Sequence, residues 1–427
     1  MDADAIVIGG GAAGLAATRR LAERSFRVVL LEARDRFGGR AWSRPAPRAT
    51  TPAELGAEFI HGRAPETAAL LREAGMSTIP TTGDSPFRSA PNIFEVAQSL
   101  REDESVDRFL ARFEGDEEMR KIAALARAFV EGFEAADPAI ASVRAIADEW
   151  QSGVDSSSAR PRGGYGPMLD RLVDACVAAG AQLRPSSVAR KIAWRRGNVA
   201  VDLVGEGAEP RTLRARAAIV TLPISILRHA GDDPDVVFDP ALPPAKRAAL
   251  SGIEMGHVVK IALWFRTAFW EHVDDGRYRD ASFLYREGQT FPAYWTQFPV
   301  RSTLVIAWAG GPKAVALHGL SEKELVERAR SGFGALLEQP ELARREFERG
   351  LTHDWSRDPF SRGAYSYLAV GAAGARAGLA KPLSKTLFFA GEASSTDGQG
   401  GTVNGALHTG ERAAAEAAAA LRTKANG

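Results

Sequence analysis

The apolar positions at the amino end of the chain change period twice within a short distance. Residues 5–8 and 27–31 are short apolar runs of the kind that form buried strands, and residues 12–23 between them have the spacing of a helix. A strand, helix and strand in about 30 residues is typical of the start of a doubly wound α/β sheet. We therefore predict a Rossmann-like α/β domain that begins at the first residues.

Two segments in the middle of the chain repeat apolar residues at the three- and four-residue spacing of amphipathic helices. These residues are Val106, Phe109, Leu110 and Phe113 in the first segment, and Ile122, Leu125, Ala126 and Phe129 in the second. We expect both helices to pack the helical part of a second domain rather than to carry chemistry. The charges from Arg101 to Lys121 could form an acidic funnel for cations, but we interpret them as a solvated helix face.

The carboxyl end repeats the order of strand, glycine turn and helix. Residues 386–390 are an apolar strand, and a helix is expected to begin at Thr402 and Val403 and to run into an Ala-rich stretch. No stretch approaches the roughly 20 apolar residues that span a bilayer. The acidic first residues leave no room for a secretory signal. We therefore expect a soluble protein.

Composition limits the kind of partner. A chain of 427 residues favours two domains, and a net charge of +1 gives no global field for nucleic acid or an anionic membrane. We therefore expect a small-molecule partner; oligomeric state cannot be inferred. Cys176 is the single cysteine, so disulfides within the chain and cysteine-based metal sites are excluded, and we predict no metal. This suits the reducing cytoplasm.

The turn after the first strand carries a dinucleotide fingerprint. Gly9, Gly11 and Gly14 have the G-x-G-x-x-G spacing, and Glu32 ends the second strand. Each position has a physical role: a tight turn, close approach of the backbone to a pyrophosphate, close packing of helix on sheet, and a carboxylate for ribose hydroxyls. The helix amino end adds free N–H groups for the phosphates. The fingerprint alone does not distinguish FAD from NAD.

The residues that follow Glu32, and the closing glycine motif, resemble the flavin-containing amine oxidase family, which includes monoamine and polyamine oxidases. The resemblance rests first on 31–34 with 38–40, and on 388–392 with 401–406. It continues through 54–62, which is similar to polyamine oxidases. Further matches are the strand at 219–223, the segment 255–261 and the segment 355–366. The resemblance implies FAD as cofactor and oxidation of an amine.

The resemblance also implies an FAD-binding domain interleaved with an α+β substrate-binding domain that contains a mixed sheet and helices. We expect the first domain to comprise 1–77, 163–240 and 380–427, and the second to comprise 78–162 and 241–379. Fingerprint and resemblance together predict an FAD site formed by Gly9, Gly11, Ala13, Gly14, Glu32, Ala33, Arg34, Gly39, Arg40, Gly56, Ala57, Glu58, Val188, Gly391, Glu392, Gly401, Thr402 and Val403. Arg34 and Arg40 are expected near adenosine and pyrophosphate, and the helix from Thr402 near the flavin ring.

Three residues are candidates for catalysis by the same resemblance. Lys260 lies in an apolar run where a charge needs a partner, and the family places it near flavin N5, where it assists reoxidation. The alternative is a lysine on an edge strand that reaches solvent. Tyr365 is the expected wall of an aromatic cage that steers the amine. His61 either faces the substrate and changes charge near neutral pH, or is structural.

The chain departs from the family at two places. Ala364 stands where monoamine oxidases carry the cysteine that bonds the flavin, so we expect noncovalent FAD. Near Gly400 there is no aromatic residue for the second cage wall, although Trp308 or Tyr367 could substitute. A wider pocket would suit a bulky secondary amine.

The predicted reaction is hydride transfer from the carbon next to the amine nitrogen to flavin N5, hydrolysis of the imine, and reoxidation by O2 to give hydrogen peroxide. The substrate is expected to be a polyamine or a bulky secondary amine. Three alternatives stay open at this point: an L-amino-acid oxidase-like flavoenzyme, an NAD(P)-linked oxidoreductase that uses the first fingerprint alone, and a flavin-binding interaction protein without turnover.

Overall fold

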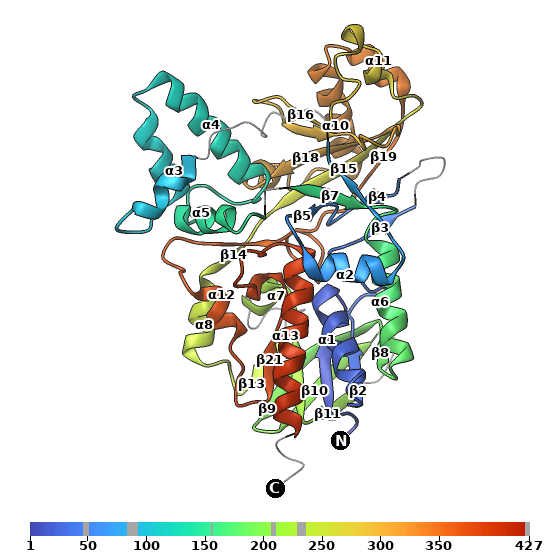
Figure 1. Ribbon diagram of the computed structural model, residues 1–427, viewed down its shortest axis with the longest axis vertical. Coiled ribbons are helices and arrows are strands. Elements are labelled where there is room, and N and C mark those ends of the chain that lie inside the picture. Colours follow the sequence, from blue (N-terminus) through green and yellow to red (C-terminus); the bar gives the residue numbers. More distant parts are fainter. Residues whose placement is uncertain (46–50, 83–92, 155–156, 206–210, 229–235, 423–427) are drawn as a thin grey trace.

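The computed structural model describes residues 1–45, 51–82, 93–154, 157–205, 211–228 and 236–422. It has a lower body that contains both termini and an upper body that divides into two lobes (Figure 1). The first strand, helix and strand are those predicted from the apolar pattern: β1 (Ala5–Ile8), α1 (Ala12–Ala22) and β2 (Val28–Leu31).

A five-stranded parallel sheet forms the centre of the lower body. Its order is β21-β12-β1-β2-β8, so strands from three distant parts of the chain lie side by side. The bounds are Gln182–Arg184 for β8, Ala217–Val220 for β12 and Leu387–Phe389 for β21. A parallel sheet of this kind is covered on both faces, which explains why β1, β2, β12 and β21 are entirely apolar.

The two faces of the parallel sheet pack against different layers. Ala5 and Val7 face a core shared with α1, α6 (Gly166–Ala178) and α13 (Val403–Arg422). Ile6 and Ile8 face a second core. That core is shared with the sheet β11-β10-β9-β13, whose strands are Arg211–Ala215, Asn198–Gly205, Ser187–Arg195 and Val237–Asp239.

The second core also contains segments that the predicted boundaries assign to the other domain. Apolar residues of 242–255 and 372–379 pack with β1 and β2 in it. They belong to α8 (Pro244–Ser251), β14 (Ile253–Met255) and α12 (Ala375–Ala380) or to their connections, and α7 (Ile224–Arg228) and β20 (Ser366–Leu368) pack in the same core. The packing therefore shifts these boundaries from 241 to about 256 and from 380 to about 370, and we propose that division.

A five-stranded sheet of order β16-β17-β18-β15-β19 forms one lobe of the upper body. Its strands are Phe283–Tyr285, Ala293–Trp295, Leu304–Gly310, Val258–Phe265 and Phe347–Thr352 in that order. Val259, Ile261 and Leu263 on β15 pack on α10 (Glu322–Leu336). The alternate residues of β15, from Val258 to Trp264, point to the opposite face of this sheet.

The other lobe is helical, as the sequence predicts. It contains η1 (Ile93–Ser99), α3 (Val106–Leu110), α4 (Glu117–Gly132) and α5 (Val143–Gln151) around a shared apolar core. The side chains of Ser105, Asp116 and Ser142 accept hydrogen bonds from the first turns of α3, α4 and α5, which fixes where these helices begin.

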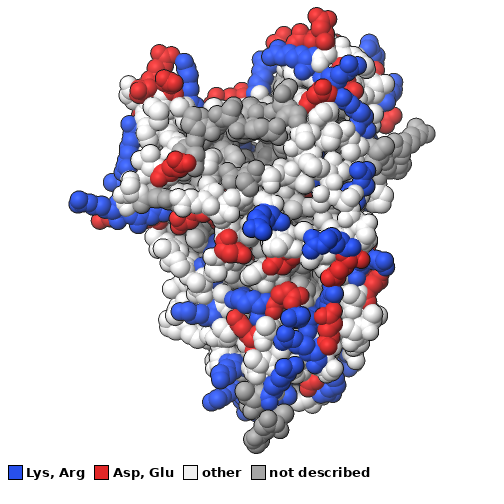
Figure 2. Space-filling view, in the orientation of Figure 1, with Lys and Arg blue, Asp and Glu red and all other residues white. Residues whose placement is uncertain are grey.

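The remaining elements connect the bodies or lie at their edges. They are β3 (Ser43–Arg44), β4 (Ala53–Glu54), β5 (Ile60–His61), α2 (Pro65–Glu73), β6 (Thr78–Pro80), η2 (Ala111–Phe113), β7 (Ser158–Pro161), η3 (Phe269–Glu271), η4 (Asp274–Gly276), α9 (Pro312–Val315), α11 (Pro340–Glu346) and η5 (Glu392–Ser394). None of the helices in the described ranges has both the length and the apolar character needed to cross a membrane. Basic and acidic side chains mix across the face shown in Figure 2.

Candidate functional site

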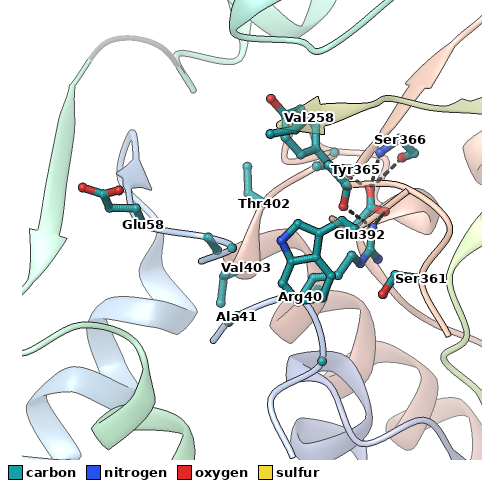
Figure 3. Close-up of a pocket in the computed structure, with 18 of the residues that line it drawn as sticks. Arg40, Ala41, Glu58, Val258, Ser361, Tyr365, Ser366, Glu392, Thr402 and Val403 are labelled. Carbon is teal, nitrogen blue, oxygen red and sulfur yellow. Dashed lines mark hydrogen bonds and ion pairs between the residues drawn. The ribbon is translucent and has the colours of Figure 1, made fainter. Parts of the chain in front are cut away.

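A cavity of about 1140 Å³ runs between the two bodies. The predicted cofactor residues all line it except Gly14, and the three predicted catalytic residues line it too. Residues from both ends of the chain and from its middle therefore meet in one space, where Ala41, Val258 and the start of α13 at Thr402 and Val403 are visible (Figure 3).

The glycine turn at one end of the cavity is built by close backbone packing. Gly9 has a φ of +107°, which favours glycine, and its N–H donates to the Leu31 carbonyl at 2.8 Å. A Cβ on Gly14 would lie 1.8 Å from the Gly9 carbonyl oxygen, so Gly14 permits the helix to approach the strand. Gly11 precedes α1, whose first turn contains no acidic residue. The free N–H groups of the first turn of α1 therefore place a partial positive charge at the cavity.

Glu32 has a structural role as well as its predicted ribose role. Its carboxylate accepts hydrogen bonds from the Gly10 N–H at 2.7 Å and from the Arg34 N–H at 2.9 Å. The side chain is buried, yet it lines the cavity. Glu32 therefore fixes the turn that carries the fingerprint and presents its carboxylate beside it.

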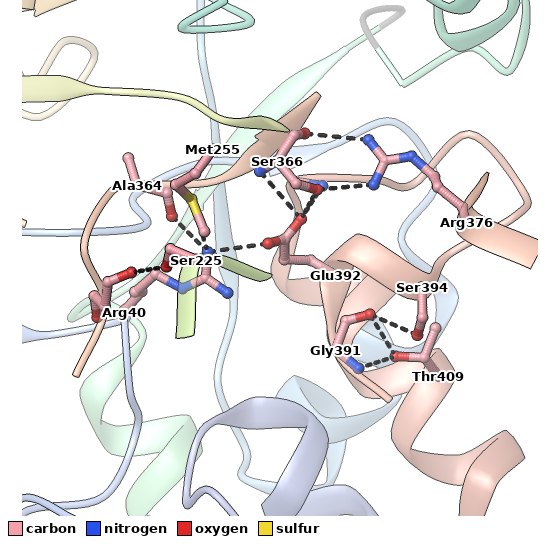
Figure 4. Close-up of polar contacts among 12 residues, drawn as sticks. Arg40, Ser225, Met255, Ala364, Ser366, Arg376, Gly391, Glu392, Ser394 and Thr409 are labelled. Atoms are coloured by element: carbon pink, nitrogen blue, oxygen red, sulfur yellow. Dashed lines mark hydrogen bonds and ion pairs between the residues drawn. The ribbon is translucent and has the colours of Figure 1, made fainter. Parts of the chain in front are cut away.

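Arg34 and Arg40 line the cavity, and both bind carboxylates across it. Arg34 Nη2 lies 2.5 Å from an Asp358 carboxylate oxygen. Arg40 Nη1 donates to the Ala364 carbonyl at 2.7 Å and to Glu392 at 3.0 Å (Figure 4). Each arginine thus ties the amino-terminal motif to a distant segment, a role that the sequence did not predict.

Glu392 is the centre of a buried network rather than a free ligand. It accepts from Arg40 and, at 2.6 Å, from the Ser366 hydroxyl (Figure 4). It also accepts from the Gly401 N–H at 3.0 Å. Burial opposes its charge, but Arg40 and Arg376 hold the pKa of Glu392 below its ordinary value. The ionised carboxylate thereby holds the closing glycine motif against the segment that bears Tyr365.

The closing helix begins at the cavity. Gly391 has a φ of +125° and its N–H donates to the Thr409 hydroxyl of α13 at 3.0 Å (Figure 4). The Thr402 hydroxyl accepts from the Gly405 N–H at 2.9 Å and so caps the first turn, which contains no acidic residue. The helix terminus therefore places partial positive charge at the cavity, as predicted.

Lys260 is buried on a central strand, so the edge-strand alternative is wrong. β15 lies between β18 and β19, and Lys260 is only 2% exposed. Its ammonium donates to Glu58 at 2.7 Å and to the Gly56 carbonyl at 3.1 Å. Glu58 is the partner that the sequence argument required but did not identify.

Glu58 lines the cavity, but its carboxylate is occupied by protein donors. Besides Lys260 it accepts from Arg160 Nε at 2.8 Å and from Trp295 Nε1 at 3.0 Å. In Figure 3 its carboxylate points away from Thr402 and Val403. The structure thus shows that the Glu58 carboxylate binds Lys260, and the cofactor contact of Glu58 stays a prediction.

Tyr365 is held rigidly at the cavity wall. Its hydroxyl donates to the Phe133 carbonyl at 2.6 Å, and burial raises its pKa. Its ring lies against Gly401, where a Cβ would be 3.2 Å away.

The region near Gly400 has no aromatic wall because Arg376 fills the space behind it. A Cβ on Gly400 would lie 2.5 Å from the Arg376 guanidinium, which pairs with Glu149 at 3.2 Å. Of the two substitutes considered, Trp308 lines the cavity, whereas Tyr367 is packed in the core of the helical lobe.

His61 lines the cavity with a neutral ring. Burial lowers its pKa to about 4, so the expected change of charge near neutral pH is wrong. Its ring packs edge-on against Phe133 with centroids 5.1 Å apart. This places His61 among the aromatic residues of the substrate end.

The substrate end contains residues that sequence reasoning did not select. Ile122, Leu125 and Phe129 of α4, which we expected to pack the helical part of the second domain, also line the cavity. Glu134 and Glu149 line it as well and share a hydrogen bond, and burial raises the pKa of Glu149. The only signal in the sequence was the amphipathic period, which does not show what the apolar face covers.

Comparisons with known proteins agree with this geometry. The model of the family of flavin-containing amine oxidoreductases matches residues 12–92 and 91–418. The chain belongs to this family. The chain is therefore an FAD-dependent amine oxidoreductase.

Individual relatives cover nearly all of the chain. It is 28% identical to polyamine oxidase 4 of Oryza sativa subsp. japonica, over 96% of this chain and 88% of that protein. It is 24% identical to human lysine-specific histone demethylase 2, over 97% of this chain and 53% of that protein. Putrescine oxidase bound to putrescine has the same fold, with a TM-score of 0.78, 19% identity and coverage of 98% and 99% of the two chains. Cyclohexylamine oxidase from Brevibacterium oxydans IH-35A also has this fold, with a TM-score of 0.76, 20% identity and coverage of 100% of both chains.

The cavity of this amine oxidoreductase fits an FAD molecule. Its volume exceeds the roughly 300–1,000 Å³ of ordinary small-molecule sites, and the glycine turns of both motifs leave backbone rather than side chains at its wall. Gly56 adds a further close approach, since a Cβ there would lie 1.8 Å from the Arg40 carbonyl oxygen. Ala13, Ala33, Gly39, Ala57 and Val188 complete the predicted lining.

Proposed function

We propose that the protein is a noncovalent FAD oxidase whose substrate is a polyamine or another large amine. FAD would lie with its adenosine beside Gly9, Gly11 and Glu32 and with its ring between Lys260 and Tyr365. The observation that carries this proposal is the single cavity that joins both glycine motifs to those two side chains. Ala364 offers no sulfur for a covalent bond.

When bound, FAD supplies a hydride acceptor for the carbon next to the amine nitrogen. The imine would then be hydrolysed and O2 would receive the electrons, giving hydrogen peroxide. The residues of the chain must exclude water from the bound amine and orient its carbon toward the flavin, while the amine nitrogen is neutral. Tyr365 supports this task because its hydroxyl bond to Phe133 holds the far end of its ring in place.

The substrate end favours a cation. Glu134 and Glu149 lie on the cavity wall, where Glu149 is paired with Arg376 at 3.2 Å, and the neutral ring of His61 does not repel an ammonium group. A long amine could therefore place one nitrogen near Tyr365 and another near these carboxyl groups. The similarity to a polyamine oxidase supports the same substrate class.

An amino-acid substrate is less favoured because it needs a cation for its carboxylate. The positively charged residues that line the cavity in the described ranges are Arg34, Arg40, Lys260 and Lys313. Each of them is paired with an Asp or Glu side chain.

We propose the cytoplasm as the location, since the single cysteine is buried and reduced.

Anaerobic mixing of the purified yellow protein with an amine tests the function. Spermidine, putrescine, benzylamine, cyclohexylamine and leucine form a suitable panel. We expect a polyamine to bleach the flavin absorbance and air to restore it with release of peroxide. Bleaching by leucine alone, or a colourless protein, would contradict the proposal.

Acid precipitation should release all FAD to the supernatant, and yellow precipitate would disprove noncovalent binding.

Glu134→Gln tests the part of the substrate site that contains Glu134 and Glu149. The change keeps the shape of the side chain and removes its capacity for charge, so KM for a polyamine should rise about tenfold, the effect of one lost charged hydrogen bond. KM for benzylamine, which has no second nitrogen, is the matched control and should stay unchanged. Equal effects on both amines would remove Glu134 from substrate recognition.

A further inference from the structure

Glu58 lines the cavity and, among the residues that the structure describes, is the only carboxylate in direct contact with two buried cations. Lys260 reaches it from β15 and Arg160 from β7, and Trp295 adds a neutral donor from β17. Glu58, Lys260 and Arg160 are all at most 6% exposed. Burying such a cluster costs free energy unless its charges are well paired and hydrogen-bonded, so its place beside the cavity needs an explanation.

The charges of this cluster do not cancel. One carboxylate faces two cations, which leaves a net charge of +1. Burial raises the pKa of Glu58, but the two cations overcome this effect and lower it to about 2, so Glu58 is ionised throughout the neutral range. Arg160 Nη2 donates to the Thr296 carbonyl at 3.1 Å, while its buried Nη1 has no hydrogen-bond partner among the described residues.

The cluster fixes the position of the Lys260 nitrogen. Glu58 and the Gly56 carbonyl accept two of its hydrogens, and the Trp295 ring lies 5.4 Å away. An ammonium group has three donors. The third remains on a side chain that lines the cavity.

Other groups that face Lys260 add one further charge. Glu54 lies in the same segment as Glu58, and burial raises its pKa to about 7 although Ser43 and Lys260 oppose this. The neighbouring strands contribute Trp308 from β18 and Thr352 from β19, neither of which titrates. Below neutral pH the cluster is therefore cationic as a whole.

Resting on the proposed oxidase activity, we propose that Glu58 is a positioning residue for the reaction with oxygen. With Arg160 it holds Lys260 as a fixed ammonium ion, so that a net positive charge stands at the cavity wall when electrons pass to O2. Two electrons and two protons convert O2 to hydrogen peroxide, and the oxygen is anionic until both protons arrive. A preorganised positive charge stabilises that anion without reorganisation.

Stopped-flow kinetics of Glu58→Gln test this role, because amine reduction and oxygen reaction can be measured separately. Loss of the carboxylate should release the Lys260 ammonium from its fixed position and slow reoxidation by about tenfold, even though the cluster then carries more positive charge. Anaerobic reduction by amine should stay within about twofold. Glu58→Asp, which keeps the charge, should restore most of the oxygen rate.

A double-mutant cycle with Lys260→Met separates positioning from a general structural role. If Glu58 acts through Lys260, Glu58→Gln should add no further slowing in the Lys260→Met background. Further slowing there, equal loss in both half-reactions, or an unchanged oxygen rate in Glu58→Gln would each overturn the inference.

A second variant covers the case in which Glu58→Gln does not retain FAD. Arg160→Gln keeps the pair between Glu58 and Lys260 but removes the surplus charge, so reoxidation should slow about threefold while reduction does not. An unchanged oxygen rate in this variant would also overturn the inference. If reduced wild-type protein fails to react with air, the proposed oxidase function is wrong, which is a distinguishable result.

Discussion

The two ends of the cavity are built in different ways. At the cofactor end the wall is mostly backbone: the turn at Gly9–Gly11, the approach at Gly56 and the first turn of α13. At the substrate end the wall is mostly side chains, contributed by α4, α5, β5 and β18. A backbone wall depends on local conformation, whereas a side-chain wall depends on which distant elements meet.

This difference predicts how each end tolerates change. The cofactor end binds one invariant molecule through backbone N–H groups and closely packed glycines, so a methyl group added to one of these glycines should be harmful. The substrate end can exchange side chains and thereby change its amine without loss of the fold. Ion pairs such as Arg40–Glu392 join the amino-terminal motif to the closing glycine motif, so a change of either partner should weaken the cofactor end.

The largest expected effect is that of Gly14→Ala. The new methyl group would lie 1.8 Å from the Gly9 carbonyl oxygen, so the helix must move away from the strand. Overpacking of this kind should cost about 3 kcal/mol or more of unfolding free energy, and FAD should be lost. Thermal unfolding and the flavin content of the purified protein measure both effects.

Gly132→Ala is the matched control at the substrate end. Gly132 also lines the cavity, ends α4, and has no atom within 4 Å of the position of a new Cβ. Its replacement should leave flavin content unchanged and stability equal or slightly higher. If Gly132→Ala were as harmful as Gly14→Ala, the contrast between a backbone wall and a side-chain wall would be wrong.

The next effect concerns two carboxyl groups four residues apart. Burial raises the pKa of Glu54 to about 7, whereas Lys260 and Arg160, against the effect of burial, lower that of Glu58 to about 2. A raised pKa means that the native state binds a proton more tightly than the unfolded chain. The stability contributed by Glu54 is therefore complete below pH 4.5 and is lost as pH rises through 7.

Glu54→Gln should remove this loss. At pH 8 the variant should be more stable than the wild type by up to about 3 kcal/mol relative to their difference at pH 4.5. Melting temperatures across this range measure the effect. A constant difference between the two proteins at every pH would show that Glu54 does not titrate as its burial implies.

The cofactor end could be predicted from the sequence because its determinants are local. The spacing of Gly9, Gly11 and Gly14 and the apolar strands around it determine both the turn and its chemistry within about 30 residues. The structure brings these residues to the cavity wall or, for Gly14, to the contact behind it. The parallel sheet follows from the same apolar runs.

The substrate end could not be predicted because its contacts join residues far apart in the chain. Lys260 required a partner, but no pattern pointed to Glu58, 202 positions earlier. The same amphipathic period described α4 whether its apolar face covered a core or a cavity. Arg376 behind Gly400 is a further example, since only packing shows that it fills that space.

The smallest expected effect is that of His61→Phe on the pH dependence of catalysis. Because burial lowers the pKa of His61 to about 4, its ring is neutral wherever the enzyme is expected to work. The profile of kcat/KM between pH 5.5 and 9 should therefore keep its shape, although its height can change with the packing against Phe133. Loss of an inflection between pH 6 and 7 in the variant would show that His61 does carry charge. A charged imidazole there would repel a cationic amine, so this outcome would also count against the proposed substrate class.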